Sequence, residues 1–156
     1  MLSKIRTLSA EQCCKIQSAL SDDSLQWVPF TFLVPDEDSE EVSIKYAKCV
    51  LNTLPPEMLT YILDAAPMYN GTEAHAVVIN RYLPGDFILP HVDRGNFCYL
   101  ITVPLQTGVD GITVDGIFYQ DEVGMGLPLK RKELWHHVSP VKELRYSMLY
   151  LYGKFE

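Results

Sequence analysis

The sequence predicts a mainly β fold, a jelly roll of two sheets preceded by helices. Eight short segments rich in β-branched and aromatic residues follow one another from about residue 73, with turn residues between them. Before that point, three stretches repeat apolar residues at helical spacing. Short strands that come after helices are typical of a double-sheet jelly roll with a helical buttress against one outer face.

Length and composition are those of one globular domain. The chain has 156 residues, of which 47% are hydrophobic and 21% are charged. We therefore expect a single domain over residues 1–156. Within it, about residues 1–72 form a buttress of helices and strand, and about residues 73–156 form the jelly-roll core.

Neither a membrane segment nor a disulfide framework is indicated. No apolar run approaches the length that spans a membrane, and the first residues are too polar for a signal peptide. The four cysteines lack the spacing of a zinc site, and the adjacent Cys13 and Cys14 make a poor disulfide pair. We expect reduced thiols, a cytoplasmic location and no membrane partner.

The charge of the chain counts against a nucleic-acid partner. The net charge is −7 and the isoelectric point is near 5.0. Proteins that grip nucleic acid usually carry a basic patch, because neutralising phosphates supplies most of the affinity. The one basic cluster, at residues 130–132, is more simply interpreted as a solvated turn.

The first two elements are a helix and a strand. Residues 9–20 are expected to be helical, because Ser9 can cap the helix and Gln12 completes a capping box. Residues 25–34 are rich in aromatic and β-branched side chains and predict a strand. Pro29 places that strand at a sheet edge, since proline cannot donate to a neighbouring strand.

Two further helices are expected before the jelly roll. An acidic turn at residues 35–41 leads into a helix at about 39–53, whose apolar residues fall on one face. Pro55 and Pro56 end it and begin another helix, which runs to about Ala65. Its inward face carries four apolar residues: Met58, Leu59, Ile62 and Leu63.

The strand-like segments of the jelly roll are short and regularly spaced. They are residues 74–82, 87–93, 97–106, 111–114, 116–120, 127–131, 133–138 and 145–152. Asp115 and Gly116 separate two of these segments and form a strong hairpin signal.

A histidine and a carboxylate stand two residues apart in the second of these strands. Residues i and i+2 of a strand project from the same face, so the side chains of His91 and Asp93 point into one space. An imidazole and a carboxylate that converge in this way are two thirds of the 2-His-1-carboxylate triad, which holds Fe(II) and leaves coordination positions open. The third ligand must be a distant histidine that a sheet brings alongside.

The distant histidine can be chosen by strand parity. His136 and His137 are adjacent, so on a strand they face opposite sides. If His136 faces inward, the apolar Leu134 and Val138 accompany it. If His137 faces inward, Glu133 and Ser139 must be buried with it instead. The first arrangement is favoured, with His137 as a flanking residue, while His75 is interpreted as an ordinary surface or core histidine.

Taken together, these motifs resemble the Fe(II)- and 2-oxoglutarate-dependent dioxygenases over about residues 76–153. Arg145 and Ser147 follow His136 by nine and eleven positions. The residues HHVSPV followed by RYS look like the ending of the prolyl 4-hydroxylase branch. The residues NRYLPG, which contain Asn80 and Tyr82, look like that branch or like the AlkB-type nucleobase demethylases.

This resemblance implies the cofactors and their ligands. It assigns Fe(II) to His91, Asp93 and His136, and 2-oxoglutarate to Arg145, with Ser147 adding a hydrogen bond. A guanidinium can take a carboxylate through two parallel hydrogen bonds. Asn80 and Tyr82 share a face and could also bond the cosubstrate. The implied fold is a cupin-like double-stranded β-helix.

The implied reaction consumes O2 and releases succinate and CO2, with hydroxylation as the default outcome. A prolyl hydroxylase-like enzyme acting on a peptide or amino-acid side chain is favoured. The AlkB-type demethylase is the alternative, but Leu151 stands where that branch carries a second arginine. Another alternative is a cupin-like metal-binding protein without oxygenase activity. A buried Arg145 without an anion would be costly in any of them.

Overall fold

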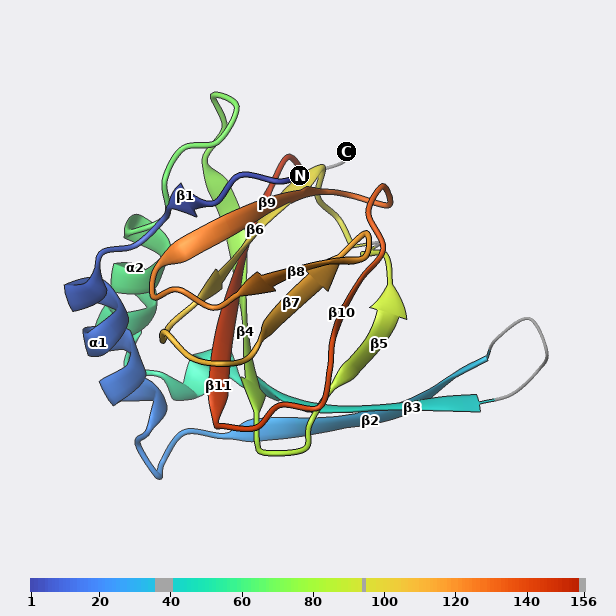
Figure 1. Cartoon of the computed structure of the whole chain (residues 1–156). Coiled ribbons are helices and arrows are strands. Elements are labelled where there is room, and N and C mark those ends of the chain that lie inside the picture. Colours follow the sequence, from blue (N-terminus) through green and yellow to red (C-terminus); the bar gives the residue numbers. More distant parts are fainter. Residues whose placement is uncertain (36–40, 94, 155–156) are drawn as a thin grey trace.

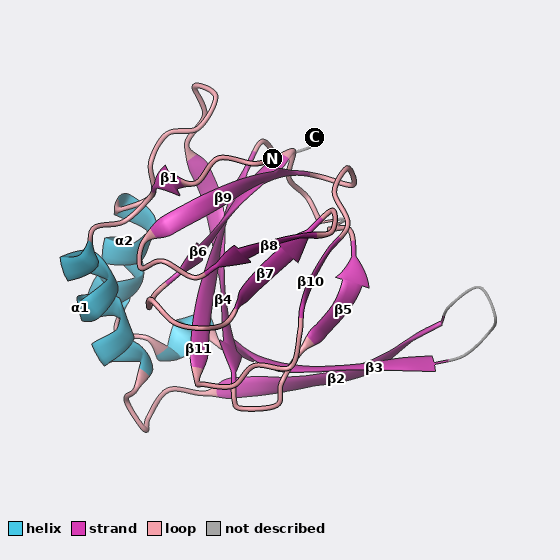
Figure 2. Ribbon diagram, in the orientation of Figure 1, coloured by secondary structure: helices cyan, strands magenta, loops and turns pink. Residues whose placement is uncertain are grey.

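The computed structural model describes residues 1–35, 41–93 and 95–154, and for residues 30–35 and 41–44 it describes the backbone alone (Figures 1 and 2). Its elements run in the order β1 (Ile5–Arg6), α1 (Ala10–Leu20), β2 (Trp27–Pro35), β3 (Glu41–Cys49), a 3-10 turn (Leu51–Thr53), α2 (Pro56–Asp64), β4 (Ala74–Tyr82), β5 (Ile88–His91), β6 (Tyr99–Pro104), β7 (Gly111–Val114), β8 (Ile117–Gln120), β9 (Met125–Lys130), β10 (His136–Val138) and β11 (Arg145–Tyr152).

The strands form two antiparallel sheets that face each other, and the helices cover the outer face of the larger one (Figure 1). The major sheet has the strand order β1-β9-β6-β11-β4-β3-β2, and the minor sheet has the order β5-β10-β7-β8. The fold is therefore the mainly β jelly roll with a helical buttress that the sequence predicts. The division of the domain near residue 73 stays a prediction, because β1, β2 and β3 extend the same major sheet.

Strand parity divides the apolar side chains between two cores. Along β11, the residues Tyr146, Met148, Tyr150 and Tyr152 enter the core between the major sheet and the helices. Leu149 and Leu151 face the core between the two sheets, where they meet residues of the minor sheet such as Ile112 and Val138. Alternate residues of one strand thus serve both layers, as the pleat requires.

The two α-helices begin and end as expected. The Ser9 side chain accepts a hydrogen bond from the Gln12 backbone N–H, and the Gln12 side chain accepts one from the Ser9 backbone N–H, so the capping box is formed. The inward face of α2 is partly different from the prediction. Ile62 is fully buried, whereas Leu63 is exposed, because it lies one position beyond the stripe that contacts the sheet. Neither helix, nor any other in the described ranges, has the length and hydrophobicity needed to cross a membrane.

The helix expected at about residues 39–53 is wrong. Residues 36–40 lie outside the described part of the chain, and the rest forms strand β3 and the 3-10 turn. β3 pairs along its whole length with β2 and, at Ala47 and Lys48, with β4. Over so short a segment, aromatic and β-branched residues fit the spacing of a helix and of a strand equally well. Pairing with β2 makes this segment a strand. β2 lies at the sheet edge, as Pro29 indicated.

The jelly-roll strands overlap the predicted segments, but β5 ends at His91, so Asp93 follows the strand instead of lying on it. β4, β7 and β11 have the predicted limits, and β8 begins after the Asp115–Gly116 turn. Both turn residues have positive φ, 48° and 80°, which is the conformation that a two-residue hairpin turn requires. The four cysteines are free thiols. The short β1, only two residues long, was too brief to be recognised from its sequence.

Candidate metal centre

Two strands of the minor sheet bring the three candidate ligands together. His91 ends β5, His136 begins β10, and the two residues are directly paired across the ladder. Nε2 of His91 lies 3.4 Å from Oδ1 of Asp93, and Nε2 of His136 lies 3.0 Å from Oδ2. The three residues offer one ligand atom each within 4.8 Å of one another, and they are the one such group among the described residues.

Backbone hydrogen bonds turn both imidazoles toward the carboxylate. Nδ1 of His91 lies 2.8 Å from the carbonyl of Leu89, and Nδ1 of His136 lies 3.0 Å from the carbonyl of Leu134. A carbonyl can only accept, so each Nδ1 carries a proton, and a ring that is neutral directs the lone pair of Nε2 inward. This arrangement of the outer nitrogen is the one that metal-binding histidines adopt.

The carboxylate of Asp93 fits a cation better than it fits its present neighbours. Its Oδ2 is buried and accepts no hydrogen bond from the described residues. With neutral imidazoles, lone pairs of nitrogen and oxygen face each other 3.0 Å apart, which is repulsive unless a positive charge lies between them. Two nitrogens and a carboxylate with open positions beside them are the donor set of a non-haem Fe(II) site.

The charges of the three candidate ligands also favour a positive charge between them. Burial alone would raise the pKa of Asp93, but the imidazoles of His136 and His91 outweigh it and hold that pKa well below its usual range. Burial alone would lower the pKa of His136, but the Asp93 carboxylate beside it raises that pKa. The site therefore favours a negative carboxylate next to positive charge, which either a proton or a metal ion can supply.

The neighbouring histidine lies apart from this group. His136 is buried and contacts Asp93, whereas His137 is paired with Thr113 and points to the other face of the minor sheet. The burial of β10 alternates along its three residues, as the parity argument requires. That His136 rather than His137 binds the metal stays a prediction, now with a defined geometry. His75, at the far end of β4, lies near the Asn96 carbonyl.

A cavity of about 250 Å³ opens beside the candidate ligands, between the two sheets. His91, Asp93 and His136 line it from the minor-sheet side. The four residues predicted to bind a cosubstrate line it from the major sheet: Asn80, Tyr82, Arg145 and Ser147. β4 and β11 are adjacent, with Arg145 paired to Tyr82 and Ser147 paired to Asn80, so the four side chains form one polar patch.

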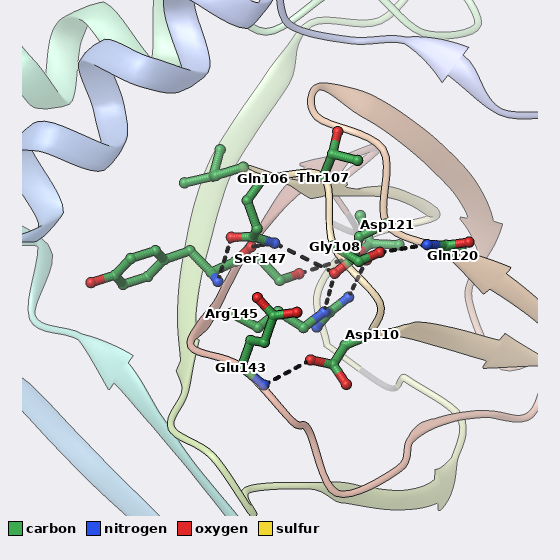
Figure 3. A network of polar contacts seen from close by, with 12 residues as sticks. Gln106, Thr107, Gly108, Asp110, Gln120, Asp121, Glu143, Arg145 and Ser147 are labelled. Carbon is green, nitrogen blue, oxygen red and sulfur yellow. Dashed lines mark hydrogen bonds and ion pairs between the residues drawn. The ribbon is translucent and has the colours of Figure 1, made fainter.

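Arg145 already has an anionic partner within the protein. Its Nε donates to Oδ2 of Asp121 at 2.7 Å and its Nη2 donates to Oδ1 at 3.1 Å (Figure 3). Both side chains are almost completely buried. Burial alone would lower the pKa of Arg145, but Asp121 outweighs it and raises that pKa. The anion that a buried Arg145 requires is thus supplied by a residue that the sequence did not single out.

The other three polar residues of this patch, Ser147, Asn80 and Tyr82, have different contacts. Oγ of Ser147 lies 3.2 Å from Oγ1 of Thr102. Oδ1 of Asn80 is buried and has no hydrogen-bond partner among the described residues. The Tyr82 ring lies between the guanidinium of Arg145, 5.2 Å from its centroid, and the stacked ring of Tyr46, 5.5 Å away. That each of them forms a hydrogen bond with the cosubstrate stays a prediction.

Sequence reasoning missed the cavity residues Tyr46 and Lys48 because of one wrong element, and it did not single out Thr102 on a correctly predicted strand. Tyr46 and Lys48 belong to β3, and as alternate residues of a strand both face the cavity. Burial lowers the pKa of Lys48, while the nearby Asp93 opposes that shift. Thr102 lies on β6, next to Ser147. The alternation of Tyr46 and Lys48 was the available signal, but a helical stripe described the same residues equally well.

Comparisons with known proteins agree with this architecture. The sequence matches no family model and no curated protein. The fold is similar to that of a 2OG-Fe(II) oxygenase family oxidoreductase from Burkholderia pseudomallei, with a TM-score of 0.61 and 17% identity over 95% of this chain and 81% of that chain.

Two prolyl hydroxylases have similar folds. One is a prolyl-4-hydroxylase from Pseudomonas putida, with a TM-score of 0.59 and 17% identity over 97% of this chain and 92% of that chain. The other is the collagen prolyl hydroxylase of Paramecium Bursaria Chlorella virus-1 in its 2OG complex, with a TM-score of 0.56 and 15% identity over 98% and 96%. This chain therefore has the fold of the 2OG-Fe(II) oxygenases.

Proposed function

We propose that this chain is an oxygenase that depends on Fe(II) and 2-oxoglutarate. The observation that carries the proposal is the convergence of His91, Asp93 and His136 at one end of a cavity that also contains a buried arginine. A metal site and a carboxylate-binding residue within one cavity are what a metal-chelating dicarboxylate requires. When bound, iron and 2-oxoglutarate supply the oxidising chemistry that inserts an oxygen atom from O2 into a C–H bond, with release of succinate and CO2.

The residues of the chain have separate roles in this scheme. His91, Asp93 and His136 hold the metal, and the carbonyls of Leu89 and Leu134 keep the two imidazoles in the correct tautomer. Arg145 attracts the distal carboxylate of the cosubstrate, with Ser147 beside it. Asn80 presents an amide whose oxygen has no partner in the part of the chain that the structure describes, and rotation of that amide can turn either its oxygen or its nitrogen toward a ligand.

The substrate proposed is a peptide or amino-acid side chain, as in the prolyl hydroxylases. Two similar structures are prolyl hydroxylases, which supports this class over others. The net charge of −7 and the presence of Leu151 in place of a second arginine weigh against an AlkB-type demethylase acting on nucleic acid. The cavity wall near the metal also carries the apolar Ile88 and Val138, which suit an aliphatic side chain.

A second candidate is favoured by one specific observation. Because Arg145 is already paired with Asp121, the cavity is not obliged to bind an anion. A cupin-like metal-binding protein without oxygenase activity would have the same triad and the same satisfied arginine. The two candidates differ in one respect, since only the oxygenase converts 2-oxoglutarate to succinate.

Succinate formation is the experiment that separates these functions. The Fe(II)-loaded protein is incubated with 2-oxoglutarate and O2, together with proline-containing peptides, free amino acids or methylated single-stranded DNA in parallel. Peptide-stimulated succinate production, matched by a mass increase of one oxygen atom in the peptide, is expected. Stimulation by methylated DNA alone would favour the demethylase. Metal binding with no succinate under any condition would favour the metal-binding protein.

A further inference from the structure

We propose that Asp121 is an internal counter-ion of the cosubstrate anchor, which competes with the distal carboxylate of 2-oxoglutarate for the charge of Arg145. The proposal rests on the proposed function, because it concerns how that function's cosubstrate is held. It makes Asp121 a residue that sets cosubstrate affinity, without contact with the reacting atoms.

The ion pair occupies one complete edge of the guanidinium. Arg145 uses Nε and Nη2 for the two oxygens of Asp121, at 2.7 and 3.1 Å. The side chains are 4% and 3% exposed, so water screens the pair very little. The face of the guanidinium lies over the Tyr82 ring. A guanidinium has five N–H donors, so three of them, on Nη1 and Nη2, are left for a ligand.

Asp121 is held in place by its own surroundings, as Figure 3 shows. Its backbone N–H donates to the carbonyl of Asp110 at 2.9 Å. Nε2 of Gln106 lies 3.4 Å from Oδ2 of Asp121 and also donates to the carbonyl of Tyr146 at 3.1 Å. Oε1 of Gln106 in turn accepts from the Tyr146 backbone at 2.9 Å. The carboxylate is therefore fixed, and a ligand must bind Arg145 with Asp121 still present.

A fixed carboxylate changes the electrostatics of the anchor. Arg145 and Asp121 together are neutral, so the deep end of the cavity attracts a second carboxylate less than a lone arginine would. The ligand carboxylate can use only the N–H groups that Asp121 leaves open, in a cavity that is also lined by the hydroxyl-bearing residues Ser147 and Thr102. In return, Arg145 is not left as a buried unpaired charge when the cosubstrate is absent.

Removing the charge of Asp121 should therefore have two linked effects. In Asp121→Asn, Arg145 keeps its charge but loses its ionic partner, so the cosubstrate-free protein becomes less stable. Binding of a carboxylate then relieves that penalty, so 2-oxoglutarate should bind on the order of tenfold more tightly, within the usual range of coupling between sites. Because the two effects share one cause, 2-oxoglutarate should stabilise the variant more than it stabilises the wild type.

The test compares two ligands on two variants. Titration calorimetry with the Mn(II)-loaded full chain measures the affinity for 2-oxoglutarate and for 2-oxopentanoate, which lacks the distal carboxylate. The matched control is Glu122→Gln, because the neighbouring Glu122 carboxylate is exposed and pairs with Lys4 instead of Arg145. We expect Asp121→Asn to tighten 2-oxoglutarate about tenfold and to leave 2-oxopentanoate unchanged. Glu122→Gln should change neither affinity.

The outcomes separate this proposal from the proposed function. If the wild type binds neither ligand in the presence of metal, the proposed function fails. If the wild type binds 2-oxoglutarate and Asp121→Asn binds it equally or more weakly, Asp121 is an orienting partner and the competition is refuted. If Asp121→Asn does not fold alone, its refolding yield is measured against 2-oxoglutarate concentration. A yield that rises supports the proposal, and a yield independent of 2-oxoglutarate overturns it.

Discussion

Nε2 of His136 lies 3.0 Å from Oδ2 of Asp93, while Nδ1 of the same ring is directed at the carbonyl of Leu134. The backbone thus fixes which nitrogen faces the carboxylate, and in the neutral ring that nitrogen carries a lone pair. Two facing acceptors in a half-buried site are unfavourable without a positive charge between them. Side chains alternate along the three-residue strand β10. One histidine, His136, therefore lies at the cavity, and its neighbour His137 lies away from it.

Replacing His136 should remove metal binding, whereas replacing His137 should leave most of it. In His136→Ala, one of three ligands is lost, and we expect the affinity for Fe(II) or Mn(II) to fall at least a hundredfold, by analogy with the 10- to 100-fold cost of altering only an outer partner. His137→Ala is the matched control, since His137 points to the other face of the sheet. Equilibrium metal titration measures both. Equal losses, or a larger loss in His137→Ala, would refute the parity argument.

Removing Arg145 alone should damage both stability and cosubstrate binding. Arg145→Ala leaves Asp121 charged and buried without its partner, which costs about 3–5 kcal/mol of unfolding free energy. The affinity for 2-oxoglutarate should fall by roughly ten- to a thousandfold, while metal affinity is retained. Urea unfolding and ligand titration measure the two effects.

The double variant Arg145→Met/Asp121→Asn separates these two contributions. It removes both charges, so most of the stability should return, since well-packed neutral groups can replace a buried ion pair at little cost. The 2-oxoglutarate affinity should remain low, because the anchor is absent. A double variant that binds 2-oxoglutarate like the wild type would show that Arg145 is not the anchor.

A buried hydrogen bond joins α2 to the major sheet. The hydroxyl of Tyr150 on β11 donates to the carbonyl of Ile62 on α2 at 2.6 Å, in a fully buried setting. Tyr150→Phe leaves that carbonyl without this donor, so we expect a loss of about 1–3 kcal/mol in unfolding free energy. Tyr69 is half-buried at the margin of the same core, so Tyr69→Phe should lower the unfolding free energy by no more than about 0.5 kcal/mol. Losses of equal size would remove the special role of Tyr150.

The adjacent cysteines of α1 should differ sharply in reactivity. Cys13 is fully buried, and burial raises its pKa to about 11, while Cys14 is exposed. Burial likewise raises the pKa of Cys49 to about 11. A thiol reacts as the thiolate, so at pH 8 iodoacetamide should label Cys14 well before Cys13 and Cys49. Tandem mass spectrometry distinguishes the neighbouring sites, and Cys14→Ser supplies the control. Faster labelling of Cys13 would contradict the placement of α1.

The sequence predicts most of the jelly roll because local pattern and tertiary environment agree there. β11 alternates between two cores along its whole length, and Asp115–Gly116 has the chemistry of one turn type. β3 was missed because its apolar spacing suits helix and strand equally, and the choice depends on pairing with β2. Recognition of Lys48 as a cavity residue was lost with it.

Asp121 could not be recognised for a different reason. It follows β8 in a loop, where nothing in the neighbouring residues marks it as a partner of Arg145. The sequence indicates that a buried arginine needs an anion, but it does not say whether that anion belongs to a ligand or to the protein. The candidate ligands His91 and His136 were easier, because each lies on a strand whose parity directs it to one side. Asp93 was expected on the same strand as His91, but it follows the end of β5 and reaches the site from the loop.

The central claim, a metal site that also binds 2-oxoglutarate, is tested most directly by anaerobic titration of the apoprotein with Fe(II) and then 2-oxoglutarate. A charge-transfer absorption band arises only when the keto acid chelates the iron. We expect a saturable band that requires both components, persists in His137→Ala and is lost in His136→Ala. Tight Fe(II) binding without any band on addition of 2-oxoglutarate would contradict the account and identify the chain as a metal-binding protein of the same fold.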